Sequence, residues 1–185
     1  LLAARGYHEA INYSFVDAAL QSQLFPDAAA VALANPIASD LAVMRVSLWP
    51  GLLRALRENQ RRQQERVRLI EHGSVFLVEG GATREVDMLA GVASGTRAPE
   101  QWGSTKSPVD FHDVKGDIEA LLATTGDSTD IEYLAGASTC LHPGRSATIV
   151  RGGRRVGSLG ELHPELVRAL ELTYVPVLFE LEFAA

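Results

Sequence analysis

Two very short connections between strand-like segments constrain the fold of this chain more than any other feature. Residues 67–78 and 85–94 are apolar enough to form β-strands, and only the turn EGGATR separates them. A second pair lies within residues 147–159, ATIVRGGRRVGSL, where Gly152 and Gly153 supply the positive φ angles that a two-residue hairpin turn needs. Connections this short cannot carry a parallel crossover, so both pairs predict antiparallel hairpins.

Helices and further strands are predicted around these hairpins. The clearest helix covers residues 110–123, where apolar side chains recur with a period of about 3.6 residues behind an Asp110 N-cap. The last segment, VPVLFELEF, alternates like a strand and places Glu180 and Glu182 on a water-facing side. Hairpins mixed with helices, without regular βα alternation, predict an α+β fold with a largely antiparallel sheet. The remaining predicted elements are helices at 17–24, 48–64 and 163–172 and strands at 8–15 and 30–36.

Composition is that of an ordinary globular domain. The 185 residues, 46% hydrophobic and 22% charged, suit a single domain over residues 1–185, with a boundary within 96–109 as the alternative. The net charge of −6 argues against a general nucleic-acid-coating role. Cys140 is the only cysteine, which excludes an internal disulfide and indicates a reducing compartment. No apolar run approaches the roughly 18 residues of a membrane span, so no membrane contact is expected.

The start of the sequence suggests a piece of a longer protein. It lacks an initial Met, and its first residues are typical of the end of a helix, with Arg5 in the last turn and Gly6 as the C-cap.

Motifs of catalysis and metal binding are not found. The sequence holds no Gly-x-Ser-x-Gly elbow, Walker loop or Gly-x-Gly-x-x-Gly, and no two histidines have metal-ligand spacing. Four residues of the predicted helix at 110–123 carry metal-ligand chemistry: His112, Asp113, Asp117 and Glu119. They point over a wide arc, which favours a solvated polar face over a metal site. Residues 141–147, LHPGRSA, are either a ligand loop or a tight turn before the hairpin, and turn chemistry favours the turn.

A basic stripe follows the predicted helix at 48–64. Six of the 17 Lys and Arg residues fall here within fifteen positions. Guanidinium groups in a single-sign stripe suit contact with RNA phosphates or with acidic groups on a partner. The alternative is a solvated helix face, partly neutralised by Glu58 and Glu65. The candidates for RNA or acidic-partner contact are Arg54, Arg57, Arg61 and Arg62, and Arg66 and Arg68 complete the stripe.

An arginine and a tryptophan stand at the entry to the same helix, in the segment MRVSLWPGLL. Buried arginine and aromatic residues are common anchors of protein interfaces, which favours a subunit contact through Arg45 and Trp49. The alternative is that Trp49 packs in the domain's own core while Arg45 pairs with a nearby carboxylate such as Asp40. The apolar stripe of the helix that follows consists of Leu52, Leu53 and Leu56.

Five segments resemble a known family when they are taken in order. They are NPIASDLAVMRVSLWPGLLRALRENQRR, VRLIEHGSVF, VDFHDVKGDIEALL, LHPGRSATIVRGGRRVGSLGELHPE and VPVLFELEF. Together they are similar to the core domain of the bacterial phenylalanyl-tRNA synthetase beta subunit, from Gly6 to Phe183. The resemblance implies a class II aminoacyl-tRNA synthetase-like fold, with an antiparallel sheet flanked by helices. In this cytoplasmic family two alpha and two beta subunits assemble, and the alpha subunit holds the active site for phenylalanine and ATP.

The resemblance also implies what this segment does in such an assembly. The beta core is a catalytically silent relative of the alpha core and packs against it, so Arg45, Trp49, Leu52, Leu53 and Leu56 become candidates for the alpha contact. ATP and magnesium are used by the whole complex, which also contacts tRNA, and this domain is expected to hold no cofactor. The editing, magnesium-carrying and anticodon-binding-like modules of beta lie outside this segment.

The expected absence of catalytic activity has a basis in the residues. Class II adenylation uses arginines that clamp ATP phosphates, because a guanidinium stays charged and offers a planar fork of donors. This chain has Leu77, Val78 and Glu79 where the catalytic relatives place one such arginine, and no Gly-x-Gly-x-Asp-Arg segment follows its last strand. We therefore expect no catalytic residue. The rival hypotheses are an adenylating domain that binds ATP itself and a tRNA-binding module that uses the basic stripe.

Overall fold

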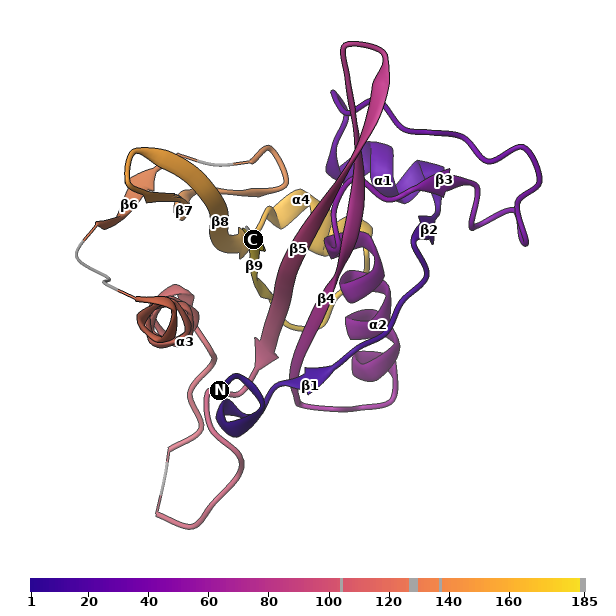
Figure 1. Cartoon of the computed structure of the whole chain (residues 1–185). Helices are drawn as coiled ribbons and strands as arrows, with labels where there is room; N and C mark the ends of the chain where they lie inside the picture. Colours follow the sequence, from indigo (N-terminus) through magenta and orange to yellow (C-terminus); the bar gives the residue numbers. More distant parts are fainter. Residues whose placement is uncertain (104, 127–129, 137, 184–185) are drawn as a thin grey trace.

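A seven-stranded sheet forms the centre of the protein (Figure 1). The structure is a computed structural model that describes residues 1–103, 105–126, 130–136 and 138–183. Strand order is β1-β4-β5-β9-β8-β7-β6, and every neighbouring pair is antiparallel except β1 with β4. This confirms the predicted α+β fold. The strands are β1 (His8–Glu9), β4 (Arg66–Glu79), β5 (Ala82–Gly95), β6 (Ile131–Ala135), β7 (Leu141–Arg151), β8 (Arg154–Leu162) and β9 (Val177–Glu182).

Both predicted hairpins are confirmed. Strands β4 and β5 pair along their whole length, and the turn between them is Gly80-Gly81, with φ angles of 59° and 83°. Strands β7 and β8 are joined by Gly152-Gly153, with φ angles of 57° and 77°. Residues with a Cβ rarely adopt these angles, so glycine is what permits each two-residue turn.

The helices begin close to the predicted positions and end earlier in two cases. Asp17 caps the first helix, and Asp110 forms a reciprocal capping box with Asp113 on the third. The second helix stops near Gln63 and the fourth near Glu171, where φ angles of 61° and 54° are incompatible with a helix. The helices are α1 (Ala18–Leu24), α2 (Trp49–Arg61), α3 (Phe111–Leu122) and α4 (Pro164–Ala169), with short 3-10 turns η1 (Ala3–Arg5) and η2 (Ala123–Thr125).

The sheet is covered on both faces. Helix α2 packs against β4 and β5, whereas α3 packs against β8 and β9. Alternate residues of β9 enter the two cores, because successive side chains of a strand point to opposite faces: Leu178 joins α2, and Phe179 joins α3. The α3 core is tight at Gly91, where an added Cβ would lie 2.3 Å from Cε1 of Phe179.

Two strand predictions need correction, and one strand was missed. The predicted strand at 8–15 is only β1 and the start of β2 (Phe15–Val16), which pairs with β3 (Val43–Met44) in a separate two-stranded sheet. The segment at 30–36 forms a single bridge, between Ala32 and Val43. Strand β6, at the sheet edge, was not predicted. The segment at 96–109 leaves β5 and leads to α3, and strands on both sides of it belong to the same sheet.

Candidate subunit interface

The predicted interface anchors on α2 lie inside the protein. Trp49, Leu52, Leu53 and Leu56 are at most 2% exposed and join one hydrophobic core. The Trp49 ring stacks on Phe25 with 6.0 Å between centroids, and its Nε1 donates a hydrogen bond to the Phe179 carbonyl at 3.0 Å. The expectation that these side chains contact a second subunit is therefore corrected. The core alternative holds, because the face of α2 that carries them is turned to the sheet.

Arg45 is also buried, with 4% exposure, and its partners lie on β4. Its Nη1 forms an ion pair with Glu71, and its Nε donates to the Ser74 carbonyl at 2.8 Å. The suggested pairing of Arg45 with Asp40 is wrong, because Asp40 pairs with Arg54 at 3.1 Å. Arg45 thus connects the approach to α2 with the middle of β4 and does not reach a partner surface.

The same carboxylate holds the N-terminal segment in place. Glu71 accepts hydrogen bonds from the Asn12 side chain at 2.6 Å and from the Asn12 backbone N–H at 3.4 Å. Asn12 also packs closely on α2, since a Cβ added at Gly51 would lie 2.9 Å from the Asn12 Cβ. Arg45, Glu71 and Asn12 therefore form one network that fixes the backbone of residues 11–13.

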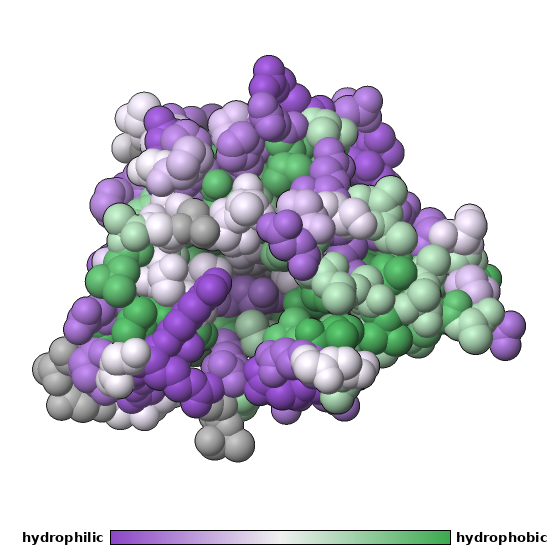
Figure 2. Space-filling model, turned by 90° about the horizontal axis from the view of Figure 1, so that it is seen from above, coloured by the Kyte–Doolittle hydropathy of each residue, from purple (hydrophilic) through white to green (hydrophobic). Residues whose placement is uncertain are grey.

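The residues on either side of Asn12 are exposed and apolar. Ile11 is 92% exposed and Tyr13 is 65% exposed. They border a hollow of about 260 Å³ against the start of α2. Figure 2 shows hydrophobic residues gathered on the side of the molecule that carries β2 and β3, which are also on the right in Figure 1. We call this surface the apolar groove and define it by Ile11, Tyr13, Phe15, Leu20, Leu41 and Pro50.

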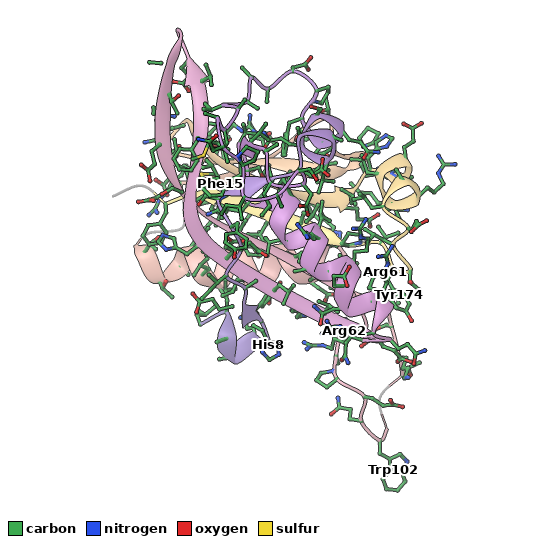
Figure 3. The ribbon with its side chains drawn as sticks, turned by 90° about the vertical axis from the view of Figure 1, so that its right-hand side faces the viewer. His8, Phe15, Arg61, Arg62, Trp102 and Tyr174 are labelled. Carbon is green, nitrogen blue, oxygen red and sulfur yellow. The ribbon has the colours of Figure 1, made fainter. Side chains whose placement is uncertain are left out.

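The basic stripe does not form one continuous surface. Arg68 lies on β4 and is buried against Asp117, and Arg66 is half-buried beside it. On α2, Arg54 pairs with Asp40, and Arg61 pairs with Glu58 at 3.6 Å and with Glu171 at 3.2 Å. Arg57 is half-buried, and Arg62 is exposed just after α2 (Figure 3). Carboxylates thus neutralise much of the stripe.

Asp117, on α3, is the centre of a second buried network. It accepts from Arg68 Nη1 at 2.7 Å, from Arg5 Nη1 at 2.8 Å and from the Tyr7 hydroxyl at 2.9 Å. Burial and the Asp117 charge raise the pKa of Tyr7 above its ordinary value, so this hydroxyl stays protonated and can donate to Asp117.

The other acidic residues of α3 are engaged separately. Asp113 completes the N-terminal capping box and pairs with Arg97 at 2.8 Å, whereas Glu119 pairs with Lys115. Within the described parts of the chain, no group of three or more His, Cys, Asp or Glu side chains is arranged to hold a metal ion. The predicted solvated polar face is therefore correct for the exposed His112 and Glu119, but it is wrong for Asp117, which is buried.

Glu180, on β9, was predicted to face water, and this is wrong. Its carboxylate accepts from the Ser47 hydroxyl at 2.9 Å and from the Leu48 backbone N–H at 2.7 Å, at the start of α2. Burial raises the pKa of Glu180 to about 7, although both hydrogen bonds and the charge of Arg45 act in the opposite direction. The segment before α2 covers this face of β9, which the alternation of the strand alone could not reveal.

Leu77 stands where the resemblance leads us to expect an ATP-clamping arginine. Leu77 is half-buried and packs against the α2 core. On the opposite face of the sheet, Phe179 and Ile118 fill the space under α3, and Arg68 is neutralised by Asp117.

The segment 141–147 is the first part of β7, with a register irregularity. His142 Nδ1 accepts from the Gly144 N–H at 3.0 Å, a local turn contact, and Arg145 pairs with Glu161 at 2.9 Å. The structure thus has a strand with a register shift where the sequence predicted a turn, and the His142 contact is local to that irregularity. Gly144 and Arg145 also border a hollow of about 570 Å³ beside the start of α3.

Comparisons with known proteins agree with this architecture. Residues 1–183 match the family described as "Phenylalanyl tRNA synthetase beta chain CLM domain". The chain belongs to this family. It is 51% identical over 181 residues to the phenylalanine–tRNA ligase beta subunit of Pseudomonas putida, covering 98% of this chain and 23% of that protein. It is 45% identical over 185 residues to the beta subunit of Coxiella burnetii, covering 100% of this chain and 23% of that protein. The chain thus spans about a quarter of the length of these curated relatives.

The fold is also similar to that of solved structures. Two structures of a pyrrolysyl-tRNA synthetase from Desulfitobacterium hafniense match with TM-scores of 0.69 and 0.71, at 16% and 17% identity. Each match covers 98% of this chain and 62% of the other. At this identity the match concerns the fold alone, and it confirms the class II synthetase-like architecture. No helix in the described residues is both long and apolar enough to cross a membrane.

Proposed function

We propose that this chain is a non-catalytic scaffold domain of a phenylalanine–tRNA ligase, and that it binds the catalytic subunit through the apolar groove. The observation that carries the proposal is the pairing of exposed apolar residues with a buried network that fixes them. Ile11 and Tyr13 face solvent, yet Asn12 between them is held by Glu71 and Arg45. A rigid apolar surface loses little conformational entropy on binding, so it suits a stable interface.

The family supports a role in an assembly of unlike subunits, because the relatives are named as beta subunits of a ligase. In the ligase as a whole, ATP and magnesium would act at the catalytic subunit. Two observations support the absence of adenylation in this chain. Leu77 packs against the α2 core, and the charge of Arg68 is neutralised by Asp117.

A first experiment tests the interface. Ile11→Asp or Tyr13→Asp in the full-length chain should weaken assembly with the catalytic subunit by about thirtyfold, the usual effect of losing an interface hot spot. Leu134→Asp on edge strand β6 is the matched control, because Leu134 is also apolar and 48% exposed. Sedimentation reports assembly, and a circular dichroism melt reports folding. Unchanged assembly in both groove variants would show that the groove is not the interface.

A second experiment tests whether this chain alone lacks adenylation activity. Phenylalanine-dependent pyrophosphate exchange should be undetectable for this chain alone and present in the assembled ligase. Exchange by the chain alone, or ATP binding in a calorimetric titration, would favour the adenylating-domain alternative.

A further inference from the structure

Arg66, the first residue of β4, is half-buried, and its side chain forms no ion pair or hydrogen bond with any described residue. Its Nε is shielded from solvent without an acceptor. The Nε of Arg68, two positions along the same strand, also lacks an acceptor, although the Nη1 of Arg68 binds Asp117. Buried polar atoms of folded proteins are nearly all hydrogen-bonded, so two neighbouring guanidinium groups with this defect indicate a bound species.

The charges around Arg66 are not balanced. Arg5 and Arg68 share the carboxylate of Asp117, at 2.8 Å and 2.7 Å, and Arg66 lies near this group without pairing to it. Three guanidinium groups therefore face one carboxylate, which leaves two positive charges uncompensated. Burial and the charge of Arg68 lower the pKa of Arg66 below its ordinary value. Water could accept from the Nε atoms but would leave this charge in place, whereas an anion would satisfy both.

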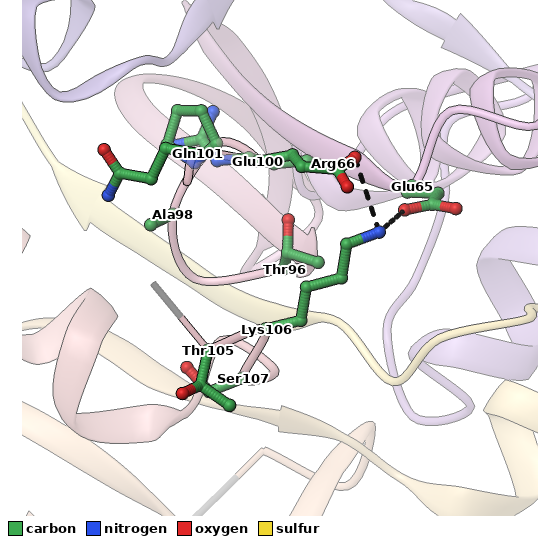
Figure 4. Close-up of a pocket in the computed structure, with 10 residues that line it drawn as sticks. Glu65, Arg66, Thr96, Ala98, Glu100, Gln101, Thr105, Lys106 and Ser107 are labelled. Carbon is green, nitrogen blue, oxygen red and sulfur yellow. Dashed lines mark hydrogen bonds and ion pairs between the residues drawn. The ribbon is translucent and has the colours of Figure 1, made fainter. Parts of the chain in front are cut away.

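Two carboxylates close to Arg66 are already bound to another cation. Glu65 and Glu100 border a hollow together with Arg66. There Lys106 contacts Glu65 at 3.1 Å and Glu100 at 3.5 Å (Figure 4). These carboxylates therefore do not neutralise Arg66.

A second hollow bordered by Arg66 has a volume of about 290 Å³ and lies where η1, β1 and the connection from α2 to β4 meet (Figure 1). Strand β1 pairs only with Leu69 and Ile70, so the first residues of β4 form an uncovered sheet edge on this side. Among the described residues, its lining contains no carboxylate, and each of its polar side chains carries an N–H donor. These polar side chains are His8, Asn59, Gln64, Arg66 and Arg68.

Gly6 allows the guanidinium group of Arg66 to approach the backbone at the edge of this hollow. Its φ angle is 84°, and an added Cβ would lie 2.9 Å from Nη2 of Arg66. This packing restricts the Arg66 side chain. A donor that is held in place loses little conformational entropy on binding, which favours a defined site over a mobile surface charge.

The charge and the number of donors favour phosphate over carboxylate as the ligand. A phosphate monoester carries about −1.5 to −2 charges at pH 7 and has three strong acceptor oxygens, whereas a carboxylate carries one charge on two oxygens. The planar fork of a guanidinium group binds two phosphate oxygens at once. A doubly charged phosphate would therefore balance the two uncompensated charges and use more of the donors.

We propose that this hollow binds a doubly charged phosphate group, either free phosphate or a terminal phosphate monoester. Arg66 is its main ligand, and the further donors are Arg68, His8 and Gln64. Arg66 begins β4 and Leu77 lies near the other end of the strand, so this site is distinct from the position where the resemblance places an ATP-clamping arginine. The site is also separate from the apolar groove and does not depend on the proposed assembly.

The test is equilibrium dialysis of the full-length chain against radiolabelled inorganic phosphate. Arg66→Gln removes the charge and the fork of donors. Arg62→Gln is the matched control, because Arg62 is an exposed arginine of the same region that does not line the hollow. We expect Arg66→Gln to weaken one phosphate site per chain by about tenfold to a hundredfold, the usual effect of a hydrogen bond to a charged group, and Arg62→Gln to bind like the unaltered chain. Equal phosphate binding by all three chains would overturn the proposal.

Thermal melts separate binding from folding. The Arg66 side chain has no partner to lose, so Arg66→Gln should melt like the unaltered chain in phosphate-free buffer. Added phosphate should raise the melting temperature of the unaltered chain more than that of Arg66→Gln, because a ligand stabilises the folded state that binds it. If Arg66→Gln does not fold, Arg66→Lys takes its place, since it keeps the charge but loses the fork, and it should also weaken phosphate binding. Unchanged binding by this variant would contradict the proposal.

Competition experiments identify the source of the phosphate. Tighter binding of a 5′-phosphorylated RNA oligonucleotide than of free phosphate would identify a terminal RNA phosphate, and equal binding would identify free phosphate; both results agree with the proposal. Equal competition by the same oligonucleotide with a 5′-hydroxyl would overturn it, because internal phosphates carry one charge each. Acetate that displaces phosphate at equal concentration would also overturn it, in favour of an acidic side chain of a partner.

Discussion

Glu180 makes stability depend on pH in a direction opposite to that of most acidic residues. Burial raises its pKa from 4.5 to about 7 in the folded protein. Between these two values the folded chain holds a proton that the unfolded chain has lost. The free energy of unfolding therefore falls as pH rises from about 4.5 to about 7, and the contribution of the protonated group is complete below 4.5.

The size of the effect follows from the shift. One pKa unit corresponds to about 1.4 kcal/mol, so the shift of Glu180 amounts to about 3 kcal/mol across this window. Glu180→Gln should abolish this part of the pH dependence. The amide oxygen can still accept from the Ser47 hydroxyl and the Leu48 N–H, but the group cannot ionise.

The assay is urea unfolding of both chains at pH values from 4.5 to 8. All other titrating groups are the same in both, so the difference in unfolding free energy isolates Glu180. As pH rises, the unfolding free energy of the glutamine variant should increase relative to that of the unaltered chain. The increase should reach about 3 kcal/mol, with most of it complete near pH 7. A difference that stays constant with pH would refute the reasoning, because it would mean that the carboxyl group is solvated in the folded state.

Three further substitutions probe the fold. Gly153→Val should reduce the free energy of unfolding by about 1–3 kcal/mol in thermal melts, because the φ angle of 77° strains a β-branched residue; an unchanged melting temperature would contradict this. Trp49→Ala should cost about 3–5 kcal/mol in urea unfolding, as for a large core residue, whereas a stable but unassembled chain would restore the interface hypothesis. Arg45→Met should also cost about 3–5 kcal/mol because it leaves Glu71 buried without its cation, and a loss below 1 kcal/mol would mean that water reaches Glu71.

The sequence predicted those elements whose signals are local. The glycine pairs at 80–81 and 152–153 specify hairpins through backbone angles, and the Asp110 cap and its apolar stripe specify α3, whatever the rest of the chain does. Strand β6 has no such signal. Only two of its five residues are half-buried and none is buried, so its side chains form no apolar pattern. The strand is defined by its pairing with β7.

The candidate site was harder to predict because it depends on contacts between distant residues. Buried cores and interface anchors use the same residue types, so the sequence could not decide whether Trp49 faces the sheet or a partner. The helical periodicity identified the apolar stripe of α2, but it could not show whether the sheet or a partner subunit covers that stripe. The partner of Arg45 was sought five residues away at Asp40, but it is Glu71, on another strand. The exposed residues Ile11 and Tyr13 were assigned to a strand, and nothing in that assignment marked them as a surface.

Arg45, just before α2, and Trp49, its first residue, stand close together because this segment connects the helix to two strands of the sheet. Arg45 reaches β4 through Glu71 and the Ser74 carbonyl, and Trp49 reaches β9 through the Phe179 carbonyl. A purely apolar segment could pack on the sheet, but it could not satisfy the backbone carbonyls or hold Asn12 through a shared carboxylate. The arginine therefore extends the rigidity of the sheet to the exposed segment at 11–13. In the proposed assembly, Arg45 does not contact the partner itself. It contributes to the interface by holding Ile11 and Tyr13 in position.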